Sequence, residues 1–291
     1  MSSLPAEAEV SAAPAEAELR EVSGPSSLGG GWRRFFSLLW LMAVTEFKRI
    51  YFGTVLGYVW SLVRPLTQFA VLLFVFTQIF RIGSDVPNYP VMLLLGIVLF
   101  SFFQEGSNNA VTAVVSQEAV VRKTQFPRLV IPLSVVLTGS FNLLVNLVVV
   151  FVFILAWGVD PTWTWLLFPL ALLLLFAYTA GFAMLLSALY VRFRDVAIIW
   201  SVLATVLFYG TPILYPIEIV PDEYKSLIMI NPLAPIFEQV RFWVLDPTAP
   251  TAVEAAGSWL ALLPAIGIFV AVCALGTWVF AREAPRIAEE L

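Results

Sequence analysis

Few side chains in this sequence are suited to catalysis or metal binding. It contains no histidine and a single cysteine, Cys273, which lies in an apolar run and is expected to be a small packed residue. The residues that usually bind zinc are therefore nearly absent, and histidine-based acid–base catalysis is not possible. We expect no metal site, no catalytic residue and no internal disulfide.

One acidic residue is notable for its position. Glu105 lies inside a long apolar stretch, within the polar run QEGSNN (104–109). An ionisable group in a membrane span is costly and usually marks function. Two roles are open for Glu105: it lines a hydrated channel, or it forms a hydrogen bond between helices. Asn142 and Asn146, one helical turn apart, are predicted to hydrogen-bond to a neighbouring helix.

The sequence has no phosphate-binding loop for a nucleoside triphosphate. The pattern G-x-x-x-x-G-K-[ST] occurs nowhere in the 291 residues. The chain therefore cannot bind ATP through that motif. The energy for active transport would have to come from a partner protein or from an ion gradient.

Three polar or basic segments lie next to the apolar runs. LGYVWSLVRP (56–65) carries Gly57 and Pro65, which would permit a sharp change of direction. QEAVVRKTQFPRLVIP (117–132) is amphipathic and basic, and YVRFRDV (190–196) is a compact turn in which arginine and aspartate could pair. Each basic segment is either a binding surface or a loop that only follows the charge rule of membrane topology.

Aromatic residues make up 14% of the chain and include ten tryptophans. Many are expected at membrane interfaces or in packed cores. Others could form a track on which the C–H faces of sugars pack, much as cations pack on aromatic rings. The candidates for lining a channel or contacting substrate are Glu105 and the aromatic residues Tyr58, Trp60, Phe102, Phe103, Phe208, Tyr209 and Tyr215.

The composition shows in which solvent these groups must work. Hydrophobic residues make up 60% of the chain and charged residues 12%, whereas a soluble domain has about half and about a quarter. Lipid must therefore surround much of the protein. Six apolar runs are long enough to span a membrane, at about 64–82, 90–115, 129–157, 163–190, 196–215 and 258–281. We predict an all-α integral membrane protein with six transmembrane helices.

The segments between and before these runs predict further elements. Residues 1–31 are rich in Ala, Glu, Pro, Ser and Gly and read as a disordered tail, and residues 283–291 as a short second tail. Residues 32–51 have helical apolar spacing flanked by basic side chains, typical of an amphipathic helix in the membrane interface. The proline-rich stretch 216–246 predicts short re-entrant or gate helices between spans five and six. Residues 158–162 predict a tight turn between spans three and four.

The distribution of basic residues predicts the orientation. If the N-terminus is cytoplasmic, thirteen of the 16 Lys and Arg residues fall in inner segments and only Arg81, Lys225 and Arg241 in outer ones. Positive charge concentrates on the cytoplasmic side. Both termini are therefore expected in the cytoplasm, and the stretch 216–246 is expected to face outward.

Taken together, these segments resemble the transmembrane subunits of ABC-2 type exporters. The resemblance rests on FPRLVIPLS (126–134), YVRFRDV (190–196) and the outer segment with Asn231-Pro232, and it covers residues 32–282. Within that family the chain is similar to the polysaccharide and polyol-phosphate exporters, a group that includes the O-antigen permease Wzm and the permeases for teichoic acid and galactan. The resemblance implies a permease of the bacterial cell membrane that carries a lipid-linked glycan.

The resemblance also implies partners. It implies a homodimer around a central channel, each subunit paired with a separate ATP-binding subunit, so that ATP and Mg²⁺ act through that partner and no cofactor is bound by this chain. No nucleic-acid partner is expected, and membrane lipid surrounds the spans. The loop that docks on the ATPase would contain Gln117, Glu118, Arg122, Lys123 and Phe126. A second cytoplasmic contact would be the turn with Arg192, Arg194 and Asp195.

Three other functions agree less well with the sequence. An ABC-2 exporter of drugs or small lipids would share the fold, but the short, aromatic-rich outer segment favours a glycan. A gradient-driven carrier would need paired intramembrane carboxylates or inverted repeats, and Glu105 is the only acid deep in a span. A membrane glycosyltransferase would need clustered acids, and the outer Glu218, Asp222 and Glu223 are too close to an interfacial loop.

Overall fold

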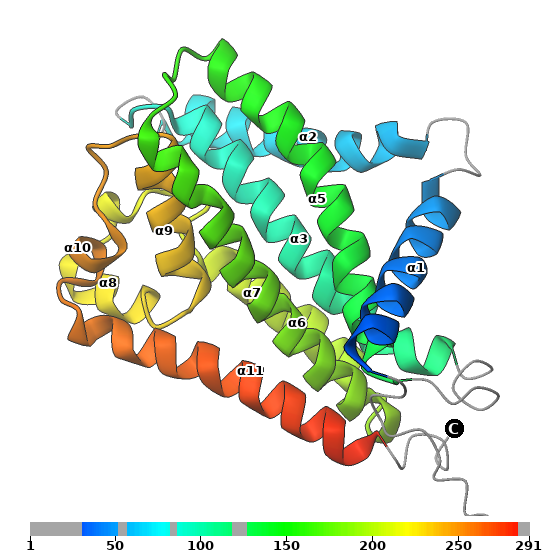
Figure 1. The fold of residues 1–291 in the computed structure, drawn as a ribbon. Coiled ribbons are helices and arrows are strands. Elements are labelled where there is room, and N and C mark those ends of the chain that lie inside the picture. Colours follow the sequence, from blue (N-terminus) through cyan, green and yellow to red (C-terminus); the bar gives the residue numbers. More distant parts are fainter. Residues whose placement is uncertain (1–30, 52–56, 82–85, 118–126, 285–291) are drawn as a thin grey trace, which may run out of the picture.

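The computed structural model describes residues 31–51, 57–81, 86–117 and 127–284. Every regular element in these ranges is helical (Figure 1), which confirms the all-α prediction. The helices are α1 Trp32–Tyr51, α2 Gly57–Phe74, η1 Val75–Ile79, α3 Tyr89–Ser116, α5 Val130–Ala156, η3 Trp163–Leu167, α6 Phe168–Arg192, α7 Val196–Gly210, η4 Ile217–Ile219, α8 Asp222–Ile228, α9 Leu233–Val244, α10 Ala252–Ala256, η5 Leu260–Leu262 and α11 Leu263–Glu283. The predicted tails, 1–31 and 283–291, lie outside the described residues except for Gly31, Glu283 and Ala284, and Glu283 is the last residue of α11.

Five helical segments in the described ranges are long and apolar enough to cross a membrane. They are Val59–Ile79, Tyr89–Ser116, Val130–Ala156, Trp163–Arg192 and Leu260–Glu283. The sixth predicted span is a shorter apolar helix, α7, of 15 residues. At 1.5 Å per residue α7 is about 22 Å long, less than the roughly 30 Å of a bilayer's hydrocarbon core.

A proline explains why α7 ends before the predicted residue 215. The residue before a proline is pushed out of the helical region, and Thr211, which precedes Pro212, is extended at φ −101° and ψ 139°. The Thr211 hydroxyl donates to the carbonyl of Leu207 at 2.6 Å and accepts from the Asn231 amide at 2.8 Å. These bonds tie the end of α7 to the outer segment.

The first span begins earlier than predicted. The sequence placed a change of direction between Gly57 and Pro65, but α2 starts at Gly57 and continues through Pro65. Pro65 is buried. Proline is tolerated inside a membrane helix where neighbouring helices and side chains satisfy the freed backbone group, so Pro65 does not mark the start of the span.

Helix α1 has the bounds that its amphipathic pattern predicted. It runs across the direction of α3, α5 and α6 rather than beside them (Figure 1). Its packed side meets α5: Trp40 and Phe47 contact the ring of Phe141, and the Thr138 hydroxyl donates to the carbonyl of Ala43 at 3.2 Å. The opposite side exposes large apolar groups, as expected of a helix in the membrane interface.

The core is built around α3, which packs on α2, α5, α6 and α7. Helices α6 and α11 approach one another most closely at paired glycines. A Cβ atom added to Gly276 would lie 2.3 Å from the carbonyl oxygen of Gly181. Small residues at such a crossing let two membrane helices pack backbone to backbone.

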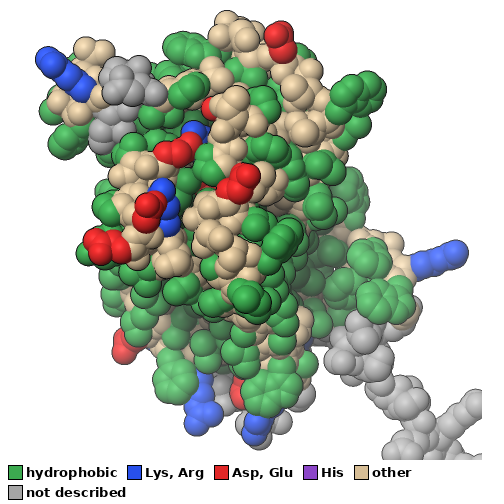
Figure 2. Space-filling view, turned by 90° about the vertical axis from the view of Figure 1, so that its left-hand side faces the viewer, with side chains coloured by type: hydrophobic (Ala, Val, Ile, Leu, Met, Phe, Trp, Pro, Cys, Tyr) green, Lys and Arg blue, Asp and Glu red, His purple; other side chains and the backbone are tan. Residues whose placement is uncertain are grey.

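The outer segment folds into short helices, as its prolines predicted. Elements η4, α8, α9 and α10 gather at one end of the molecule, the end away from the last turns of α3, α6 and α11 (Figure 1). Figure 2 shows acidic side chains among hydrophobic ones on this face. The predicted tight turn between spans three and four is also present, with Gly158 at φ +91° after the end of α5.

Candidate functional site

A groove between α2 and α7 brings together three of the aromatic candidates. It has a volume of about 800 Å³, and its walls include Trp60, Arg64 and Gln68 from α2 and Phe208 and Tyr209 from α7. The α2 residues are spaced four apart, so they lie on one face of the helix. A cation, an amide and a phenol thus line this groove among apolar side chains such as Val63, Val71 and Leu72.

Glu105 reaches the same region from α3. The Arg64 guanidinium donates to its carboxylate, with Nη1 and Oε1 3.1 Å apart. Both side chains are partly exposed. Glu105 also lines a small polar cavity with Asn142 and Asn146 of α5. The Asn146 amide, however, donates to Asn142 one turn earlier on the same helix, so the predicted hydrogen bond from Asn146 to another helix is wrong.

The other aromatic candidates are not equivalent. Phe102 is buried and borders the small cavity beside Glu105. Phe103 is fully buried in the core, stacked on Tyr178 with ring centroids 5.7 Å apart. Phe103 is therefore a packing residue and does not line the groove. Tyr215 lies five residues beyond the end of α7, and its hydroxyl donates to the carbonyl of Tyr209 at 3.2 Å.

Most of the predicted ATPase-docking loop falls outside the described residues. This applies to Glu118, Arg122, Lys123 and Phe126, and the side chain of Tyr58 is not described either. Gln117 follows the last turn of α3 as its C-terminal cap. The docking loop therefore stays a prediction.

The turn between α6 and α7 is described, and its charges do not pair as expected. No ion pair joins Asp195 to either arginine in this described turn. Instead the guanidinium of Arg192 lies 5.7 Å from the ring centroid of Phe193, and that of Arg194 lies 5.0 Å from that of Tyr190. Cation–π contact replaces the arginine–aspartate pair, and Asp195 caps α7 only through its backbone carbonyl.

A buried charge cluster fixes the outer segment. Arg241 of α9 is 5% exposed and makes a forked pair with Glu218, at 2.7 and 2.8 Å. Glu238, one turn earlier and 1% exposed, lies 3.6 Å from the same guanidinium. Its Oε2 atom has no hydrogen-bond partner among the described residues. Two acids thus share one buried arginine: Glu238 lies inside the protein, whereas the side chain of Glu218 is 44% exposed.

The environment shifts the protonation of this cluster. Burial raises the pKa of Glu238 from 4.5 to about 7, with the nearby Glu218 adding to the rise and Arg241 opposing it. Burial alone would lower the pKa of Arg241, but the carboxylates of Glu218, Glu238 and Asp246 outweigh burial and raise it. Arg241 therefore stays charged, and Glu238 changes its charge near neutral pH.

Sequence reasoning did not single out Arg64, Gln68 or Glu238 as site residues. The spacing of Trp60, Arg64 and Gln68 was visible and could have marked one polar face of α2. No comparable signal marked Glu238, because its burial depends on how α9 packs against the bundle. The groove and the cluster are both products of tertiary structure.

These observations define a class of protein: an α-helical membrane bundle with a partly polar groove along one side and a compact outer segment, which is the architecture of a transport subunit. Residues 37–245 match the family model of the ABC-2 type transporter. Since this match covers more than half of the chain, the protein belongs to the ABC-2 type transporter family. The predicted resemblance is confirmed.

Proteins similar to this chain include export permeases. The O-antigen export system permease protein RfbA of Klebsiella pneumoniae is 30% identical over 257 residues, 88% of this chain and 95% of that protein. RfbA of Myxococcus xanthus is 31% identical over 221 residues, 75% of this chain and 84% of that protein. The polysialic acid transport protein KpsM of Escherichia coli is 24% identical over 222 residues, covering 74% and 83%.

Proposed function

We propose that this chain is the membrane-spanning subunit of an ATP-driven exporter that moves a lipid-linked polysaccharide from the cytoplasmic to the outer side of a bacterial cell membrane. The family membership and the names of the similar export permeases support polysaccharide export. O-antigen, teichoic acid and galactan types all fit this class of cargo. The chain itself is not an enzyme in this proposal, because its ATP would be hydrolysed by a partner.

The observation that carries the proposal is the chemistry of the α2–α7 groove. It presents the rings of Trp60 and Tyr209 beside Arg64 and Gln68. Aromatic rings pack on the C–H faces of sugars, while amide and guanidinium groups donate to their hydroxyls. A charge in hydrocarbon is costly, so this face suits a water-filled path better than contact with lipid.

The groove is open on one side, and a second copy of the chain is the cover that we propose. Two grooves meeting at a two-fold axis would enclose a channel lined by both protomers, and closed two-fold dimers are the commonest homo-oligomers. In the same proposal an ATP-binding subunit docks on the loop around 117–126 and on the turn around 192–195. The basic residues near these elements support a cytoplasmic location for that end, and so for both termini.

The path can be tested with single cysteines in a Cys273→Ala background. Gln68→Cys and Tyr209→Cys should react with a membrane-impermeant maleimide in the reconstituted full-length protein, because their side chains would face water. Val152→Cys is the matched control, since Val152 is 62% exposed but lies on α5 away from the groove. It should stay unlabelled. A short bis-maleimide should link Tyr209→Cys between two copies.

The cargo is tested in cells. Deleting the gene should remove the polysaccharide from the cell surface and leave its lipid-linked form inside. The wild-type gene should restore export, and Tyr209→Ala or Trp60→Ala should restore it less. Normal surface polysaccharide after deletion, or labelling of Val152→Cys but not of the groove cysteines, would contradict the proposal. Drug sensitivity without loss of polysaccharide would favour the drug-exporter alternative.

A further inference from the structure

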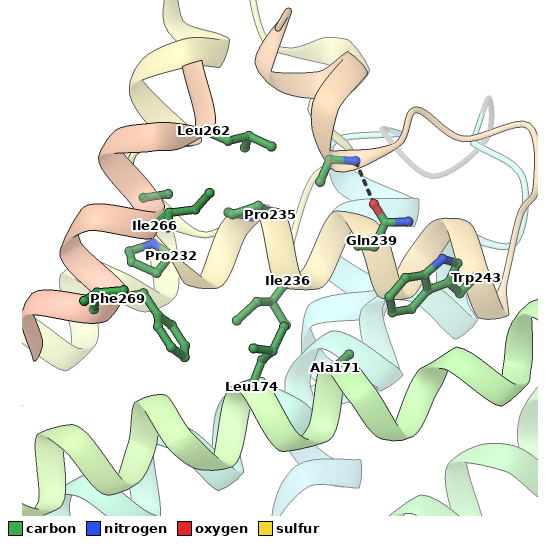
Figure 3. Close-up of a pocket in the computed structure, with 13 residues that line it drawn as sticks. Ala171, Leu174, Pro232, Pro235, Ile236, Gln239, Trp243, Leu262, Ile266 and Phe269 are labelled. Atoms are coloured by element: carbon green, nitrogen blue, oxygen red, sulfur yellow. Dashed lines mark hydrogen bonds between the residues drawn. The ribbon is translucent and has the colours of Figure 1, made fainter. Parts of the chain in front are cut away.

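A second opening has walls of a different kind. A cavity of about 420 Å³ lies between α6, α9 and α11 (Figure 3). Ala171 and Leu174 of α6, Ile236 of α9, and Ile266 and Phe269 of α11 are among the residues that line it. The walls expose only apolar atoms.

Among the residues that line this cavity, the one amide side chain already accepts a hydrogen bond at its oxygen atom. The backbone N–H of Ala252 donates to the Oε1 atom of Gln239 at 3.2 Å, the bond drawn in Figure 3. An occupant would therefore meet hydrocarbon and aromatic carbon rather than polar groups. This excludes sugars and phosphates as ligands of the cavity and favours an apolar chain.

The location of the cavity indicates which apolar chain is available. Helices α6 and α11 are both candidate membrane spans. Beside the cavity they expose Leu173 (65%), Leu263 (56%) and Val270 (57%), so its mouth opens toward lipid. Its α11 wall extends from near the start of that helix to Val270, roughly 12 Å at 1.5 Å per residue. Half of a hydrocarbon core is about 15 Å, so the cavity matches the depth of one leaflet.

The alternatives to lipid are physically unfavourable. Water does not stay in a wholly apolar cavity. An empty cavity of this size would forfeit the dispersion contacts of every lining side chain. We propose that this pocket binds one acyl chain of a membrane phospholipid, from the leaflet on the side of α9. The bound phospholipid would be a resident lipid. It is distinct from the transported polysaccharide, whose proposed path is the α2–α7 groove.

The bound chain would complete the packing of α9. One face of this helix carries Ile236 and Gln239 toward the pocket, and the other carries Glu238 and Arg241 toward a small cavity against α3. With an acyl chain in the pocket, α9 would be packed against lipid on one face and against α3 on the other. Lipid occupancy would therefore hold the outer segment in the position that buries its charge cluster.

The test uses a phosphatidylethanolamine with a diazirine halfway along one acyl chain. The full-length protein is reconstituted with trace amounts of this lipid, irradiated and mapped by peptide mass spectrometry. We expect adducts on Ile236, which is only 9% exposed, and we expect an excess of unlabelled phosphatidylethanolamine to reduce them at least fivefold. Adducts on Val148 of α5, which is 64% exposed, should dilute only in proportion to the lipid.

Two alanine-to-phenylalanine substitutions on α11, one inside the pocket and one outside it, test whether the adduct depends on the pocket. Ala265→Phe, at a buried lining position, should fill the cavity and abolish the Ile236 adduct while leaving Val148 labelled. Ala274→Phe, at an exposed position of the same helix, should change neither. Three results would overturn the proposal. The first is an Ile236 adduct that persists in the Ala265→Phe variant, and the second is an Ile236 adduct that forms only with a polyprenyl probe. The third is a crosslink between two copies of the Ile266→Cys variant, which would show that a second copy covers the cavity. Retained Val148 labelling shows that the variant is folded.

Discussion

Replacing Glu238 with glutamine should remove a pH dependence of stability that begins in the outer segment. The carboxyl is 1% exposed, and its pKa is raised from 4.5 to about 7 chiefly by burial. The folded protein therefore holds this proton more tightly than the unfolded chain does. The stabilisation is fully present below pH 4.5 and is lost as the pH rises through about 7.

The size of the effect follows from the shift. One pKa unit corresponds to about 1.4 kcal/mol. Because the folded carboxyl is already half ionised at pH 7, raising the pH from about 5.5 to 7 should lower the free energy of unfolding by about 1.6 kcal/mol. At roughly 2–4 °C per kcal/mol, that is about 3–6 °C in melting temperature. Above pH 5.5 the carboxyls with lowered pKa, such as Asp222 and Glu254, are already ionised and add no slope.

The assay is the melting temperature of the full-length protein in lipid nanodiscs across this pH range. Glu238→Gln keeps the shape of the side chain but cannot ionise, so its profile should be nearly flat. Glu223→Gln, at an exposed acid of the same outer segment, should keep the wild-type slope. A slope that persists in Glu238→Gln, or its absence from the wild type, would show that Glu238 is not the titrating group.

Two further predictions concern the packing of the bundle. Gly276→Ala should destabilise the protein by about 1–3 kcal/mol, because its Cβ would lie 2.3 Å from the Gly181 carbonyl oxygen; Gly267→Ala, with open space around it, should melt at or slightly above the wild-type temperature. Ser107→Ala should cost about 1–3 kcal/mol by leaving the buried indole N–H of Trp200, now 3.1 Å from the Ser107 hydroxyl, without an acceptor. In a double-mutant cycle with Trp200→Phe, additive losses would argue against this hydrogen bond.

Much of the fold was readable because its signals are local. Hydropathy over about 20 residues found the five long spans, and the amphipathic pattern found α1 with its observed bounds. Proline was harder to interpret. Pro212 ends α7 while Pro65 is accommodated inside α2, and the difference lies in what packs around each residue rather than in the residue type.

The candidate site was only partly predictable for a related reason. When a helix is apolar all round, its sequence does not show which side is buried. Phe103 and Tyr209 were equal candidates as aromatic residues, yet one is fully buried and the other is 61% exposed at the groove. Trp60 and Tyr209 line the same groove although they are about 150 positions apart in the sequence, and no local pattern reveals this.

The cavity beside α9 and the α2–α7 groove differ in the side chains that line them, and this difference indicates whether lipid or water is the more favourable neighbour of each. The cavity beside α9 exposes only carbon, so water gains nothing there and a lipid chain restores the lost contacts. The α2–α7 groove exposes Arg64, Gln68 and Tyr209. Lipid there would leave a guanidinium and an amide in hydrocarbon, at a cost of several kcal/mol for each polar group. Pairing with Glu105 neutralises the charge but leaves other donors of Arg64 to be satisfied. This cost of contact with lipid supports the proposal that water or a second copy of the chain covers the groove.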